Sequence, residues 1–275
     1  LSAFCTPQGR ILGLMRIFRA GDTWYLRLPL DSLDAVLARL RMYVMRADVT
    51  LEDATENFLR MGISGDQAGE RLQDAGMPAP ETVDGVAVAD GSTIIRVPGT
   101  RPRYELYLTS LETARSVWNA LNVHAAPVGE PVWRLLDILS GVPHIFSATA
   151  ELFVPQMTNL QLIDGVSFKK GCYPGQEIVA RMQYLGTLKR RMYLAWIDTD
   201  EPVAPGDEVF SEADSEQATG RIVDAQAHPD GGQQALAVLQ IRAADAGGLH
   251  LGNAGGPAMS LQSLPYPYET PADDD

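Results

Sequence analysis

Residues 169–181, KKGCYPGQEIVAR, contain one of only two cysteines in the chain. Glycines at 171 and 175 and basic residues on both sides surround Cys172, a composition typical of an exposed turn and not of a packed apolar run. The run that begins at Gln176 has the pattern of a helix, with Pro174 and Gly175 in the turn before it. Because nearby cations and a helix N-terminus both favour the thiolate form of cysteine, this stretch predicts a reactive thiol.

The charge distribution singles out the same stretch. The whole chain has a formal net charge of −13, which argues against a surface built for nonspecific nucleic-acid binding. Residues 169–191 nevertheless carry six basic residues and one acidic residue, whereas residues 192–275 carry two basic and fifteen acidic residues. We interpret the basic segment as the lining of an anion-attracting cleft around Cys172. The alternative, a solvated basic loop without a ligand, remains open.

Composition limits the class of protein. With 45% hydrophobic and 21% charged residues, the 275-residue chain is long enough for two or three globular units. No apolar run approaches the roughly 18 residues that a membrane helix needs, so we expect a cytoplasmic protein without a membrane partner. Two cysteines are too few for a disulfide framework. The chain begins with Leu1 inside a predicted strand, which suggests that its natural N-terminal part is missing.

Several kinds of site are not encoded. The four histidines, at positions 124, 144, 228 and 250, show no ligand spacing with each other or with a cysteine, so we expect no permanently bound metal. The glycine clusters do not form a phosphate-binding loop. No local histidine serves as a base for Cys172, and we expect His144 to be structural. Cys5, inside a strand, is expected to be a small buried hydrophobe.

The pattern of apolar residues divides the chain into α+β parts. A hairpin is predicted over 9–29 and a helix over 33–44, capped by Asp31 or Ser32. Residues 52–127 alternate strands and helices as in a small α+β sandwich, with a hairpin turn at 89–92. A helix over 130–139 follows, and short strands after residue 188 are typical of a small barrel. The predicted domains are therefore 1–51 plus 128–187, 52–127, and 188–275.

The motif and its flanks resemble a known family. The segment Lys170–Glu177 matches, residue for residue, the signature of the YgfZ folate-binding proteins, which are related to the T-protein (aminomethyltransferase) of the glycine cleavage system. The resemblance spans nearly the whole chain and implies a T-protein-like α+β fold, with a ferredoxin-like middle domain and a C-terminal β-barrel. It extends over 153–156, 158–161, 165–170, 180–181, 5–10 and 264–266.

The family resemblance also implies a function. It implies a folate-binding accessory protein for iron-sulfur cluster assembly or repair that supports enzymes of tRNA thiomethylation. Tetrahydrofolate would be the cofactor, iron-sulfur client enzymes the partners, and Cys172 the functional thiol of a monomeric protein. Direct contact with tRNA is left open. Trp133 matches a tryptophan assigned to folate contact, and the motif residues expected beside the cofactor are Gly171, Tyr173, Gly175, Gln176 and Glu177.

Physical type suggests a role for each side chain of the site. Lys169, Lys170 and Arg181 would hold the thiol as thiolate and attract folate carboxylates or an acidic partner. The two glycines would permit the turn, and Gln176 and Glu177 could instead satisfy backbone donors at the helix start. An indole can stack on a pterin ring, although a tryptophan is as often part of a core.

Two other functions remain alternatives to the accessory factor. A one-carbon transferase would use tetrahydrofolate in turnover, but this chain has Leu139 where T-proteins carry a glutamate that can bind the pterin edge. A non-enzymatic docking scaffold would use only the basic surface. We therefore expect an accessory factor more than a turnover enzyme.

Overall fold

The structure is a computed structural model that describes residues 1–184 and 186–268. The chain forms two compact units. The first comprises 1–17, 26–36 and 141–275, and the second comprises 18–25 and 37–140. The predicted boundary at residue 188 lies within the first unit and stays a prediction, and residues 269–275 of the predicted third domain lie outside the described residues.

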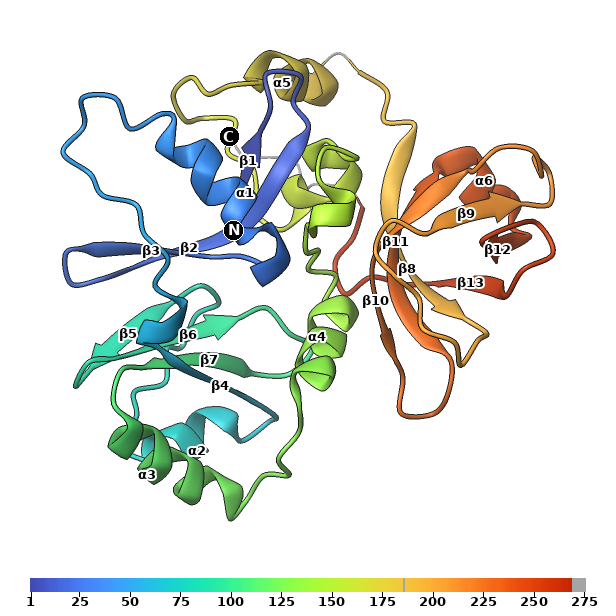
Figure 1. The fold of residues 1–275 in the computed structure, drawn as a ribbon. Coiled ribbons are helices and arrows are strands. Elements are labelled where there is room, and N and C mark those ends of the chain that lie inside the picture. The colour runs from blue at the N-terminus through green and yellow to red at the C-terminus, as the bar shows by residue number, and fades with distance from the viewer. Residues whose placement is uncertain (185, 269–275) are drawn as a thin grey trace, which may run out of the picture. The chain divides into compact units, whose positions relative to one another are not determined.

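A three-stranded antiparallel sheet opens the chain (Figure 1). The predicted hairpin forms at the expected turn, where Gly21 has a φ of 61°. Helix α1 ends earlier than its apolar pattern suggested. Neither predicted capping residue caps it, because Ser32 donates to the Pro29 carbonyl and Asp31 accepts hydrogen bonds from Ser147. The elements are β1 (Ser2–Cys5), β2 (Ile11–Ala20), β3 (Thr23–Arg27) and α1 (Leu30–Arg41).

The second unit contains a four-stranded antiparallel sheet in the order β4-β7-β6-β5. Helices α2 and α3 cover one face of this sheet (Figure 1), where Leu72, Ile94, Leu106 and Val117 are buried. The other face buries aromatic side chains. The elements are a 3-10 turn (Thr55–Asn57), β4 (Leu59–Ser64), α2 (Ala68–Asp74), β5 (Val86–Ala89), β6 (Ser92–Val97), β7 (Arg103–Leu108) and α3 (Leu111–Asn122).

Helix α4 (Glu130–Leu139) has the bounds that the sequence pattern predicts. Pro131 stands in its first turn, where a missing N–H costs nothing, and the φ of 67° at Gly141 ends the helical path. Three short 3-10 turns follow, over Ser147–Thr149, Pro155–Thr158 and Leu160–Leu162, and lead to α5 (Gln176–Tyr184).

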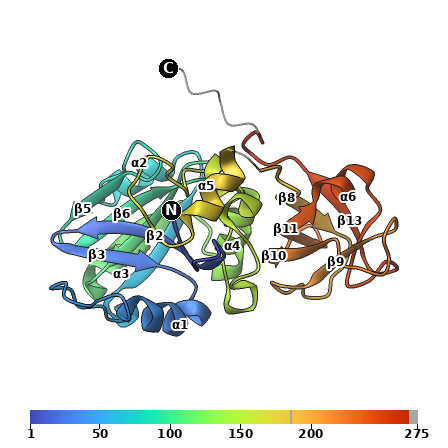
Figure 2. The same ribbon diagram turned by 90° about the horizontal axis from the view of Figure 1, so that it is seen from above.

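A closed six-stranded barrel forms the C-terminal part (Figure 2), in the order β10-β11-β8-β13-β12-β9. Alternate residues point inward, so that small side chains such as Ala195, Ala235 and Ala237 fill the narrow interior. The α+β elements and the closing barrel agree with the predicted fold class. The elements are β8 (Arg190–Ile197), β9 (Glu208–Ser211), β10 (Gly220–Ala227), β11 (Gln233–Gln240), α6 (Ile241–Ala246), β12 (Leu249–Leu251) and β13 (Ala258–Gln262).

Candidate functional site

The turn before α5 exposes one thiol. Cys172 is exposed to solvent, whereas Cys5, at the end of β1, is only 7% exposed. The two cysteines therefore differ in access, as their sequence settings predict. Because thiol chemistry requires access to the sulfur, only Cys172 is available to a ligand or partner protein in the folded chain.

Gly175 is the glycine that fixes the geometry of this turn. Its φ is 82°, and a Cβ atom there would lie 2.4 Å from the Thr6 carbonyl oxygen and 2.8 Å from the Gly9 Cα. The turn therefore packs against the β1–β2 connection, which a hydrogen bond from the Gly9 amide to the Thr6 carbonyl closes at 2.9 Å. Gly171 has open space where its Cβ would be and no left-handed φ, so the turn conformation does not require glycine there.

Gln176 closes the start of α5. Its side-chain oxygen accepts a hydrogen bond from the Tyr173 backbone N–H at 3.1 Å, and its backbone N–H donates to the Tyr173 carbonyl at 3.2 Å. This reciprocal pair supports the structural role that the sequence analysis considered for Gln176. Glu177 is exposed in the first turn, where its charge favours the helix dipole.

The cations predicted to surround the thiol are at the surface. Lys169, Lys170 and Arg181 are all exposed, and in the described part of the chain none of them forms an ion pair with a carboxylate. The Lys170 Nζ lies 4.4 Å from the centroid of the Tyr173 ring, a cation–π contact that orders this lysine beside the turn. Lys169 and Lys170 lie within three residues of the exposed thiol in the chain, and this local positive charge suits an acidic ligand or partner.

Cys5 lies in the same neighbourhood but is held as a neutral thiol. Burial raises the pKa of its thiol to about 11, and the charge of Lys170 opposes part of this rise. Burial also raises the pKa of Tyr173, with a further contribution from Cys5. The sequence expectation of a small buried hydrophobe at Cys5 is confirmed.

Side chains of the segment 155–160 hydrogen-bond to helix α5 and to β8. The buried Gln156 amide donates to the Val179 carbonyl at 2.6 Å, and the buried Asn159 amide donates to the Met192 carbonyl of β8 at 2.9 Å. Asn159 takes a φ of 58°, a conformation that asparagine tolerates better than most residues. These two amides join the helix that follows Cys172 to the outside of the barrel.

Trp133 belongs to the second unit, so its surroundings are described separately from those of Cys172. Its ring packs on β4 at Gly62, where a Cβ atom would lie 2.5 Å from the ring carbon Cζ3. The guanidinium carbon of Arg103 lies 4.3 Å from the ring centroid, and Arg103 itself pairs with the buried Asp137 at 2.9 Å. Trp133 therefore has a packing role, and the ring area left for a ligand is limited.

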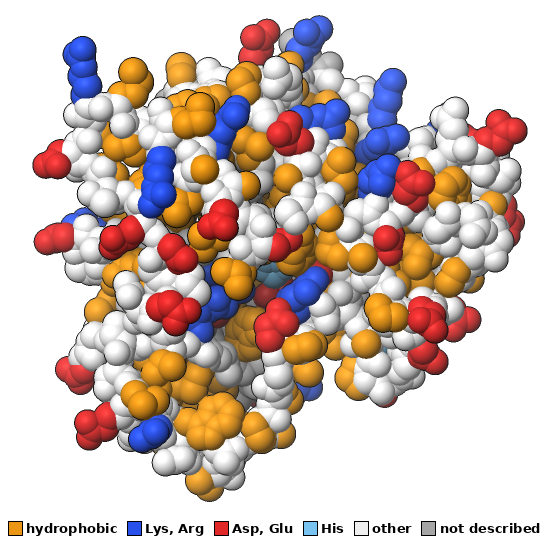
Figure 3. All heavy atoms as spheres, viewed as in Figure 1, with side chains coloured by type: hydrophobic (Ala, Val, Ile, Leu, Met, Phe, Trp, Pro, Cys, Tyr) orange, Lys and Arg blue, Asp and Glu red, His pale blue; other side chains and the backbone are white. Residues whose placement is uncertain are grey.

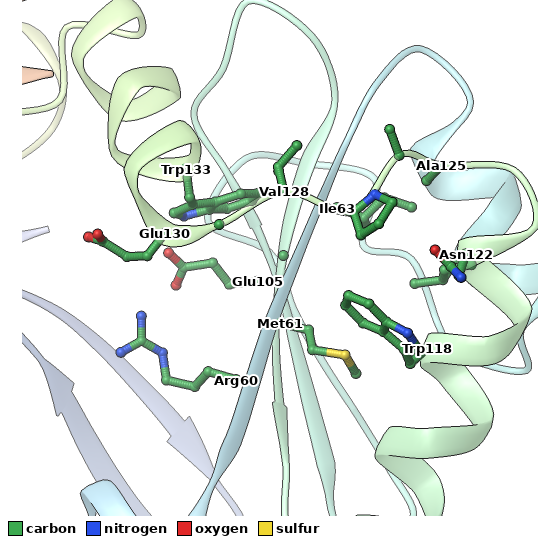
Figure 4. Close-up of a pocket in the computed structure, with 15 residues that line it drawn as sticks. Arg60, Met61, Ile63, Glu105, Trp118, Asn122, Ala125, Val128, Glu130 and Trp133 are labelled. Atoms are coloured by element: carbon green, nitrogen blue, oxygen red, sulfur yellow. The ribbon is translucent and has the colours of Figure 1, made fainter. Parts of the chain in front are cut away.

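Trp133 also lines a pocket of about 270 Å³. Figure 4 shows Trp133 projecting from α4 and Trp118 from α3, on either side of β4, which is the edge strand of its sheet. Met61 and Ile63 provide further apolar surface, and the polar groups include Arg60, Glu105, Asn122 and Glu130. A pocket lined mainly by apolar and aromatic groups, with a few polar side chains, suits a planar organic ligand.

Sequence reasoning missed a buried polar cluster around His144. Its Nε2 lies 3.1 Å from Arg27, and its Nδ1 lies 3.3 Å from Asp224, which is fully buried. Because a guanidinium only donates, Nε2 is the acceptor and Nδ1–H donates to Asp224. Both ring nitrogens are thus engaged, which supports a structural His144. No local sequence signal links Arg27, His144 and Asp224, because they are brought together only by the fold.

Within residues 1–184 and 186–268, no group of three or more His, Cys, Asp or Glu side chains is placed to hold a metal ion. No helix in the same part of the chain is both long and apolar enough to cross a membrane.

Curated proteins share similarity with nearly the whole chain. The chain is 32% identical over 270 residues to the tRNA-modifying protein YgfZ of Enterobacter sp. (strain 638), covering 98% of this chain and 82% of that protein. It is 31% identical over 266 residues to the protein of the same name from Sodalis glossinidius, covering 96% and 80%. The Colwellia psychrerythraea protein of that name is 28% identical over 267 residues, covering 97% and 81%.

Similarity to a solved structure confirms the predicted T-protein-like α+β fold. The glycine cleavage system aminomethyltransferase T of Bartonella henselae matches with a TM-score of 0.69 and 16% identity, covering 96% of this chain and 74% of that chain. No family model matches the sequence.

Proposed function

The chain belongs to the YgfZ family, and on that premise we propose that it is a folate-binding accessory protein that supports tRNA modification. Its relatives are named as tRNA-modifying proteins, and its fold is that of an aminomethyltransferase. The observation that carries the proposal is the combination of an exposed Cys172 on a fixed turn with Trp133 at the rim of an aromatic pocket.

Tetrahydrofolate is the cofactor that we propose for the pocket beside Trp133. Trp118 and Met61 supply apolar surface for a fused bicyclic ring, and Asn122 can hydrogen-bond to a ring edge. Arg60 is exposed and stands where it can attract a carboxylate of the glutamate moiety. Since Gly62 and Arg103 already contact the Trp133 ring, we propose that this indole contributes mainly its remaining edge.

Cys172 is the residue that we propose to act on client proteins. Cys172 is exposed, Lys169 and Lys170 adjoin it in the chain, and Gly175 fixes the turn, so the sulfur can meet an acidic partner surface. We propose iron-sulfur enzymes of tRNA thiomethylation as the clients, with the cluster as cargo and not as a resident cofactor of this chain. We propose that this chain assists other enzymes more than it catalyses a turnover reaction of its own.

Calorimetric titration with tetrahydrofolate tests the cofactor. We expect Trp118→Ala and Arg60→Gln to weaken binding by about ten-fold each, because each removes one pocket contact without touching the core. Trp133→Phe should weaken binding less, since phenylalanine can keep the contact with Gly62.

Trp24→Phe is the matched control, because Trp24 is 62% exposed and is not part of the pocket lining. The folate proposal fails if the unmodified protein does not bind tetrahydrofolate, or if Trp118→Ala and Arg60→Gln bind it as tightly as Trp24→Phe does.

A further inference from the structure

A second pocket, of about 240 Å³, lies against the outside of the barrel. Phe153 and Met157 supply apolar surface on one side, and Val238 of β11 supplies more. Among the described residues that line the pocket, the charged ones are two arginines, Arg190 at the start of β8 and Arg221 in β10. This pocket is separate from the tryptophan pocket, and its residues belong to the first unit alone.

The strand register places the two arginines on one face of the barrel. Arg221 pairs with Val238, and Arg190 pairs with Gln240, on opposite sides of the central strand β11. Positions 238 and 240 share a face because side chains alternate along a strand. Neighbouring strands are roughly 5 Å apart, so two long side chains on either side of β11 can converge over Val238.

Arg221 is held in place at the pocket wall. Its guanidinium donates to the Gly206 carbonyl at 2.9 Å and to the Glu208 carboxylate at 2.6 Å. Two of its five N–H donors are used in these bonds, and the bond to Glu208 keeps the group oriented. Arg190 is exposed and forms no hydrogen bond or ion pair through its side chain with any residue in the described part of the chain.

A third cation stands at the same wall. Arg10 donates to the carbonyl of Leu152, a lining residue, at 2.7 Å, so its charge lies next to the pocket. None of the described lining residues is acidic, and the Glu208 carboxylate accepts a hydrogen bond from Arg221. The local field is therefore positive, although one carboxylate offsets part of it.

This positive pocket contrasts with the rest of the barrel. Residues 192–275 contain fifteen acidic residues and only two basic ones, Arg221 and Arg242. Acidic side chains are spread over the barrel surface, on the right in Figure 3. Arg221, one of these two, lies in a concave site beside Arg190, and Glu208 offsets part of its charge.

We propose that this pocket binds a phosphate group, held between Arg190 and Arg221. A guanidinium pair matches the geometry of phosphate oxygens, and the apolar wall of Phe153, Met157 and Val238 excludes water from one side. The phosphate belongs either to a small phosphate ester or to the backbone of a nucleic acid. The proposal does not depend on folate binding.

Titrations with inorganic phosphate, adenosine 5′-monophosphate and a short oligouridine without terminal phosphates test the site. Arg190→Gln should weaken binding of whichever probe binds by about ten-fold, because one of two guanidinium partners is lost. Arg221→Gln should have a similar effect. Arg242→Gln is the matched control, since it removes the same charge from an exposed barrel arginine outside the pocket.

The three probes distinguish the sources of the phosphate. Binding of the two small probes points to a phosphate ester, and binding of the oligonucleotide alone points to a nucleic-acid backbone; both support the site if Arg190→Gln reduces them. The proposal is overturned if no probe binds at about 10 mM, if Arg190→Gln acts no more strongly than Arg242→Gln, or if citrate binds as tightly as phosphate.

Discussion

Replacing Cys5 with alanine should change how the stability of the protein depends on pH. The folded protein holds the Cys5 thiol proton with a pKa of about 11, against an ordinary value of 9.0. A pKa that is raised on folding stabilises the folded state fully below the unfolded value, and this contribution is lost as pH rises through the folded value. The window is therefore pH 9 to 11.

The magnitude follows from the two pKa values. Relative to Cys5→Ala, the unmodified protein should lose roughly 1.4 kcal/mol of unfolding free energy by pH 10, and the loss should level off at about 2.7 kcal/mol roughly one pH unit above the folded pKa. Burial also raises the pKa values of Tyr266 and Tyr268, so both proteins weaken in alkali and only their difference reports on Cys5.

Urea unfolding at intervals between pH 7.5 and pH 10.5 measures this difference. Lys170→Gln supplies an internal check, because the Lys170 charge lowers the pKa of Cys5 and its removal should move the window to higher pH. Parallel stability curves for the unmodified protein and Cys5→Ala would refute the reasoning, since they would mean that the thiol is not buried as the structure places it.

Three other predictions concern the thiol turn and the barrel. Gly175→Ala should destabilise the protein by about 2–4 kcal/mol in urea unfolding, because Gly175 has a left-handed φ and a Cβ there would clash with the Thr6 carbonyl. Gly171→Ala should change stability by less than about 0.5 kcal/mol, and equal effects of the two substitutions would contradict the turn geometry. Because Cys172 is exposed and Cys5 is buried, iodoacetamide at neutral pH should modify Cys172 alone in the folded protein, and Cys5 as well after unfolding. Mass spectrometry measures this, and modification of Cys5 in the folded protein would contradict its burial. Hydrogen bonds to the Gly256 carbonyl and Glu212 raise the pKa of His250, so the stabilisation from this histidine is present below its unfolded pKa and is lost as pH rises. His250→Gln should therefore lower Tm more at pH 6 than at pH 9, and an equal loss at both pH values would contradict this.

Local sequence signals predicted most helices and strands, because glycine, proline and other turn residues mark their ends. Helix α4 has the predicted bounds, and the β5–β6 hairpin turns at Asp90 and Gly91, which take φ values of 48° and 73°. Helix α6 (Ile241–Ala246) and strand β12 (Leu249–Leu251) were missed. Both are short, and α6 follows β11 without any turn residue between them, so no periodic pattern marks either element.

The candidate site could be predicted only in part. The motif shows that Cys172 is displayed, but it does not show which of two glycines the turn requires, because that depends on packing against Thr6 and Gly9. The tryptophan pocket combines residues of α3, α4 and β4 that lie far apart in the chain. Such long-range contacts leave no local pattern, which also explains why the sequence does not predict that Arg190 and Arg221 line one pocket.

Cys172 is, in our proposal, the functional thiol of a protein that supports tRNA modification. Mass spectrometry of tRNA nucleosides tests it most directly, in a strain that lacks its own copy and carries either the unmodified protein, Cys172→Ala or Cys5→Ala. We expect the unmodified protein and Cys5→Ala to restore thiomethylated nucleosides, while Cys172→Ala stays at the level of the deletion strain. Full restoration by a folded Cys172→Ala protein would contradict it.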